Sequence, residues 1–131
     1  MASTTEQPAP PPTDPVATVN IGATIADWLT ADTLAAIGQN MAVAIDQHER
    51  TSDEQPTWAQ ALAVVDPHLL TPLMTVPENW AKSPAVWRRE LLNRLMSRLK
   101  YAAWITYTPK PRSLRVGAQG RAWLTDRALA N

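Results

Sequence analysis

The side chains best suited to chemistry in this chain are basic, and they gather in its C-terminal part, from residue 81 onward. From Ala81 onward there are eleven lysines and arginines against two acids, a net charge of +9. Before Ala81 there is one cation, Arg50, against ten acids, a net charge of −9. Charge segregated in this way bears on the choice of partner rather than on the fold. The basic segment therefore predicts a polyanionic partner, although the formal net charge of the whole chain is zero.

A basic helix is predicted over residues 83–101. Ser83 is a favourable N-cap, and Pro84 suits the first helical position. Apolar residues at three- and four-residue spacing form one face of this helix, namely Trp87, Leu91, Leu92, Leu95, Leu99 and Ala102. A helix fits the major groove of duplex DNA, where arginine can pair with guanine and asparagine with adenine. The candidate DNA contacts on the helix are Arg88, Arg89, Asn93, Arg94, Ser97, Arg98, Lys100 and Tyr101.

A β-hairpin is predicted directly after the basic helix. Residues 104–108 are rich in β-branched and aromatic side chains, which favour a strand. The two prolines of the stretch 109–113 lack amide donors, so this stretch is expected to form the tip and 114–116 the returning strand. Basic residues of such a hairpin can contact phosphates or enter the minor groove. The candidates here are Lys110, Arg112 and Arg115.

The order of basic helix, strand, basic loop, strand and helix resembles the winged helix-turn-helix fold. Residues 114–124, Leu-Arg-Val-Gly-Ala-Gln-Gly-Arg-Ala-Trp-Leu, are similar to the passage from wing to helix in small bacterial regulators of the MarR and PadR type. The resemblance covers residues 83–124 and departs from the family pattern at Gly117, where a capping Thr or Ser is usual. It implies a mainly α fold with a small β-hairpin. It also implies duplex DNA binding by a transcriptional regulator or an accessory factor of mobile DNA.

The rest of the chain predicts an N-terminal tail and a helical scaffold. Residues 1–18 are polar and rich in proline, which predicts a disordered tail. Residues 19–131 are expected to form a single winged-helix-like domain. Its acidic helical half would span residues 19–80, and its basic helix and wing residues 81–131. The six tryptophans are expected to be the large core anchors, because the chain has no phenylalanine.

The acidic half predicts one long helix among shorter ones. A short helix is expected to start at Thr24, a long one to follow the N-cap Thr30 over 31–49, and a third to start at Thr57. Alternatively, the first two form one continuous helix. Residues 66–82 contain three prolines and predict a series of short turns. The apolar face of the 31–49 helix can pair with a second copy, giving a homodimer through Leu34, Ile37, Met41 and Ile45. Alternatively the acidic half is a solvated scaffold, or it folds over the basic half and competes with DNA.

Several classes of function lack their sequence signatures. The chain has no cysteine, which excludes disulfides, thiolate nucleophiles and Cys-based zinc sites. Its two histidines, His48 and His68, do not form a zinc-binding HExxH motif, and no nucleophile motif is present. We therefore expect no enzymatic activity, no catalytic or metal site and no cofactor. No apolar run reaches the roughly 20 residues of a membrane span and no signal peptide is visible, so a cytoplasmic location without membrane contact is expected.

Three alternatives remain for the basic segment. Its helix face can be charged only for solubility, although solvated faces usually mix both signs of charge. Aromatic stacking on single-stranded nucleic acid is a second alternative, carried by Tyr101, Trp104 or Tyr107. The third is a protein-interaction module that docks an acidic partner or self-associates, because a fold does not determine a function.

Overall fold

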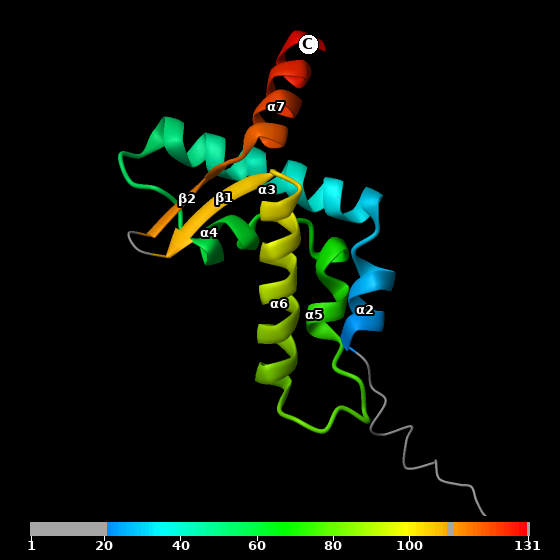
Figure 1. Cartoon of the computed structure of the whole chain (residues 1–131). Coiled ribbons are helices and arrows are strands. Elements are labelled where there is room, and N and C mark those ends of the chain that lie inside the picture. The colour runs from blue at the N-terminus through cyan, green and yellow to red at the C-terminus, as the bar shows by residue number, and fades with distance from the viewer. Residues whose placement is uncertain (1–20, 110–111, 131) are drawn as a thin grey trace, which may run out of the picture.

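The structure, a computed structural model, describes residues 21–109 and 112–130. In chain order its elements are α2 (Ile21–Trp28), α3 (Ala31–Thr51), α4 (Trp58–Ala63), the 3₁₀ helix η2 (Pro67–Leu70), α5 (Thr71–Met74), α6 (Pro84–Tyr101), β1 (Ile105–Pro109), β2 (Arg112–Val116) and α7 (Ala118–Ala130). The described part is thus mainly helical with a small two-stranded antiparallel sheet, as predicted (Figure 1). The predicted tail over residues 1–18 lies outside the described residues.

Three of these helices begin at the predicted cap residues. The Thr30 hydroxyl accepts a hydrogen bond from the amide three residues on at 3.2 Å, and α3 follows. Thr57 and Gln60 form a reciprocal capping box before α4, with distances of 2.9 and 3.0 Å. The Ser83 hydroxyl accepts from the amide of the third helical residue at 3.3 Å. Because these side chains satisfy amides that lack intrahelical partners, the local sequence is enough to place the starts of all three helices.

The first described helix starts earlier than predicted. Helix α2 begins at Ile21, so Thr24 lies inside it rather than capping it. Its inner face buries Ile25 and Trp28. We attribute the difference to tertiary packing, which outweighs a weak capping pattern in so short a helix. The proline-rich stretch after α4 forms η2 and α5, in agreement with the predicted series of short turns.

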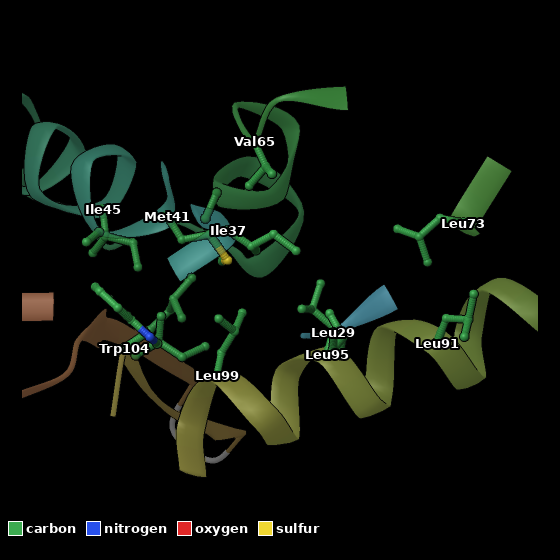
Figure 2. Close-up of a cluster of buried hydrophobic side chains, with 14 of the residues drawn as sticks. Leu29, Ile37, Met41, Ile45, Val65, Leu73, Leu91, Leu95, Leu99 and Trp104 are labelled. Atoms are coloured by element: carbon green, nitrogen blue, oxygen red, sulfur yellow. The ribbon is translucent and has the colours of Figure 1, made fainter. Parts of the chain in front are cut away.

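Helix α6 packs its apolar face into the interior. Leu91, Leu95 and Leu99 are each 0% exposed. Figure 2 shows these leucines pointing from α6 toward buried side chains of α3 and neighbouring segments, with Leu99 near Trp104. Burying a leucine stabilises the fold by roughly 1.5–3 kcal/mol relative to leaving it exposed. This packing fixes which side of α6 is left to face outward.

The α3 face that was expected to bind a second copy lies in the same core. Ile37, Met41 and Ile45 are each 0% exposed, and the half-buried Leu34 packs against them. The hairpin and α6 of the same chain lie against α3. The predicted homodimer through this face of residues 31–49 is therefore wrong, because the apolar stripe is already covered within one chain.

Three of the six tryptophans, Trp28, Trp87 and Trp104, are buried as predicted, and the other three are partly buried against the core. The Trp28 indole donates to the carbonyl of Leu69 at 2.6 Å and links α2 to η2. The Trp87 indole donates to the carbonyl of Pro72 at 2.9 Å and links α6 to α5. Buried indoles need such partners because an unsatisfied N–H destabilises the folded state. The two bonds hold the proline-broken stretch between the long helices.

The hairpin leaves α6 through a left-handed turn. Ala103 has φ 64°, the only positive φ of a non-glycine residue among those described. The amide of Trp104 donates to the carbonyl of Leu99 at 2.9 Å, and that of Ala103 to Lys100 at 3.0 Å. This pair of bonds is a Schellman motif, which satisfies the last carbonyls of a helix and turns the chain sharply. The turn directs β1 away from the end of α6.

Strand β2 is two residues longer than predicted, and β1 has the predicted length but begins and ends one residue later. Strand β1 pairs with β2 in antiparallel register from Ile105 opposite Val116 to Pro109 opposite Arg112. Residues 109 and 112–113, expected at the tip, thus belong to the strands. A proline at the end of a two-stranded sheet is tolerated because its missing donor need not face the partner strand. Only residues 110–111 separate the strands, and they lie outside the described residues.

Candidate nucleic-acid interface

The outward side of α6 carries all eight residues that were predicted to contact DNA from this helix. Each is exposed, and the set is Arg88, Arg89, Asn93, Arg94, Ser97, Arg98, Lys100 and Tyr101. Arg89, Asn93 and Ser97 follow each other at four-residue spacing and so form one row along the helix. Arg94 and Arg98 form a neighbouring row. The structure therefore brings the predicted residue types together on one surface, which we call the α6 face.

The positive charge of the α6 face is not neutralised by acids of the described chain. Within residues 21–109 and 112–130, ion pairs involve the cations Arg50, Arg115 and Arg121, none of which lies on α6. The one acid of α6, Glu90, is half-buried. Charges that protrude into water without a partner retain their field for an incoming ligand. The α6 face therefore presents a one-signed surface.

Tyr101 ends the α6 face with an exposed aromatic ring. Its side chain is 93% exposed, the highest value among the large exposed apolar residues that the structure describes. Arg98 precedes it by three residues and lies beside it on the helix surface. An aromatic ring next to a guanidinium can contact a base or a sugar as well as a phosphate.

The hairpin extends from the end of α6 and lies against α3. Figure 1 shows α2 and α5 on one side of α6 and the β1–β2 hairpin running toward the other side. The main chain of Arg112 pairs with Pro109 at the far end of the hairpin. Lys110 and the side chain of Arg112, both predicted contacts, lie outside the described residues.

Arg115, the third predicted contact of the hairpin, forms an ion pair with an acid of the same chain. Its guanidinium lies 3.7 Å from a carboxylate oxygen of Glu49 in α3. Asp46 and Glu49 also bind Arg121 of α7, at 3.3 and 3.1 Å, and Asp46 binds Arg50 at 2.9 Å. We call these five residues the ion cluster; it connects α3, β2 and α7. The sequence alone did not predict a role for Glu49 or Arg121. The one local signal was that Asp46 and Glu49, three residues apart, lie on the same face of a helix.

The hairpin base is also fixed by a loop of the acidic half. The Gln55 side chain accepts a hydrogen bond from the amide of Leu114 at 3.2 Å. Leu114 itself is fully buried. The hairpin therefore contacts the acidic half through Gln55, while the buried Leu114 packs into the core.

A groove is present away from the α6 face. This open groove of about 950 Å³ is bounded by α3, α4 and α7. His48, Val64 and Trp123 line it, and Arg127 lies 5.4 Å over the Trp123 ring. His48 and His68 take no part in a metal-binding group, because residues 21–109 and 112–130 contain no cluster of three or more potential ligands. No described helix is long and apolar enough to cross a lipid bilayer.

Comparison with known proteins adds no relative. No protein-family model, no curated protein and no solved structure matches the chain. The interpretation of the α6 face therefore depends on its own geometry and charge.

Proposed function

We propose that this protein binds duplex DNA through the α6 face, with the hairpin beside it as a wing. The observation that carries the proposal is a single exposed helix side with five cations and no neutralising acid among the described residues. An α-helix fits the major groove, which is about 12 Å wide. The residue types present also match the task, because Arg94 and Asn93 can read base edges while the other cations hold phosphates.

The order of elements supports a winged-helix interpretation of the site. A helix scaffold precedes α6, the hairpin follows it after a tight turn, and α7 packs back on α3. In helix-turn-helix proteins the second helix of the pair enters the major groove and the first crosses the backbone. By analogy, η2 and α5 would stand where the first helix stands, and α6 would be the recognition helix. The fold family is thus part of the proposal.

Chemical-shift mapping of the backbone amides tests the proposed surface. On titration of the full chain with a duplex of random sequence, we expect the largest shift changes at residues 88–101 of α6 and at the hairpin. Amides of α2 should change little, because α2 packs on the opposite side of α6. A single strand and an RNA duplex of the same length are the controls. Changes confined to the acidic elements, or none with any nucleic acid, would overturn the proposal and favour docking of an acidic protein.

A further inference from the structure

The ion cluster contains more cations than acids. Three guanidinium groups, those of Arg50, Arg115 and Arg121, share the carboxylates of Asp46 and Glu49. The three arginines come from α3, β2 and α7. The cluster therefore has a net charge of +1 and joins β2 of the proposed wing to α3 and α7.

Arg115 is the most weakly held of the three arginines. Arg121 makes hydrogen bonds to both acids, at 3.3 and 3.1 Å, and Arg50 makes one to Asp46 at 2.9 Å. Arg115 reaches Glu49 only at 3.7 Å, beyond hydrogen-bonding distance, and its side chain is 58% exposed. Exposed pairs of this kind are weak because water and salt screen them.

One carboxylate oxygen of Glu49 accepts no hydrogen bond in the described structure and could accept one from Arg115. Its Oε2 atom is buried and lacks a hydrogen-bond donor in the described structure, and this is the atom that faces Arg115. Arg115 can therefore approach Glu49 further. It can instead turn its exposed donors to an external anion, since a guanidinium carries five N–H groups in a planar fork.

We propose that Glu49 competes with the phosphates of bound DNA for Arg115 and so keeps this hairpin cation out of the interface. The inference rests on the proposed function. Arg115 lies opposite Thr106 in the sheet, and both side chains are on the exposed side of the hairpin, while the neighbouring Leu114 and Val116 are buried. Removing the charge of Glu49 leaves Arg115 with no carboxylate partner among the described residues and adds one phosphate contact.

Glu49→Gln tests the competition directly. The variant retains a side-chain oxygen that can accept from Arg121 but loses the charge that attracts Arg115. We expect the slope of log K against log salt to become steeper by about one, with affinity for random duplex rising on the order of fivefold at low salt. Asp27→Asn is the matched control, because it changes the net charge equally at an exposed position of α2. It should leave the slope unchanged.

The double variant Glu49→Gln with Arg115→Gln separates competition from a general charge effect. We expect its slope to return to that of the wild type. A gain that persists without Arg115, or a Glu49→Gln slope no steeper than that of Asp27→Asn, would overturn the inference while leaving the proposed function intact. A wild type that does not bind duplex at all would instead overturn the proposed function.

Arg115→Gln alone keeps the inference testable if circular dichroism shows that Glu49→Gln is unfolded. Because Arg115 is held by Glu49 in the wild type, we expect this variant to bind duplex with an unchanged salt slope. A slope shallower by about one would show that Arg115 already contacts a phosphate, contrary to the inference.

Discussion

Replacing Arg94 and Arg98 together with glutamate is expected to reduce the affinity for duplex DNA by at least about 100-fold, since each phosphate or base contact is worth roughly 1–3 kcal/mol. The two residues form one row on the α6 face, are exposed, and have no ion-pair partner in the described structure. The change removes two favourable contacts and opposes the phosphates with two negative charges. Each lost contact should also make the salt slope shallower by about one. Fluorescence anisotropy with a labelled random duplex measures both quantities.

A charge-matched control separates the α6 face from net charge. Lys82→Glu with Arg127→Glu makes the same change in charge at two exposed positions outside the α6 face and the ion cluster. We expect this variant to bind within a few-fold of the wild type, after circular dichroism confirms an unchanged helix content. Equal losses in the two variants would mean that overall charge, rather than the α6 face, determines binding.

Trp87→Ala is expected to lower the free energy of unfolding by about 3–5 kcal/mol. The side chain is 1% exposed, packs edge-on against Trp80 at a centroid distance of 4.9 Å, and donates to the carbonyl of Pro72. Truncation leaves a cavity where α6 meets α5 and also leaves that carbonyl without its donor. Because small domains have a total stability of about 5–15 kcal/mol, this one change can remove a large part of it. Urea denaturation followed by circular dichroism measures the effect.

Two further variants show which property of Trp87 matters. Trp87→Phe retains most of the apolar volume but has no N–H, so we expect an intermediate loss of about 1–2 kcal/mol. Tyr101→Ala, on the same helix but exposed, should change stability by less than about 0.5 kcal/mol. A loss below about 1 kcal/mol for Trp87→Ala would contradict the anchoring role of this indole, since cavities of this size cost more.

The α6 helix could be predicted from sequence because its signals are local. The Ser83 cap, the proline after it and the four-residue spacing of the leucines all lie within one segment, and the helix has the predicted bounds Pro84–Tyr101. Spacing also assigned the outward residues correctly, since the side of a helix opposite its apolar stripe faces solvent. A helix of 18 residues is thus predictable from sequence alone when its cap and its periodicity both lie within its own segment.

Features that depend on distant contacts were not predictable in the same way. The apolar stripe of α3 was assigned to a second copy, although Ile37 and Met41 lie in the core of their own chain. Periodicity shows that a face is buried but does not show which surface covers it. The pairing of Arg115 with Glu49 joins residues far apart in the chain and has no local signature. Charge counts alone therefore overstated the number of cations free of partners within the molecule.

Part of the charge segregation is used within the molecule. The acids Asp46 and Glu49 of α3 hold Arg115 of β2 and Arg121 of α7, so two cations of the basic half fasten it to the acidic half. The cations of α6 take no part in these bridges. The division is consistent with a scaffold that holds α7 by ion pairs and leaves the α6 face for a partner.

The central claim is that the α6 face binds duplex DNA, and a salt titration of wild-type binding tests it most directly. If about six cations of α6 and the hairpin meet phosphates, log K for a random duplex should fall with log salt at a slope of about −5. Binding to single-stranded DNA and to RNA, measured in parallel, should be weaker at every salt concentration. Duplex binding that is absent, or that does not change between low and physiological salt, would contradict the claim.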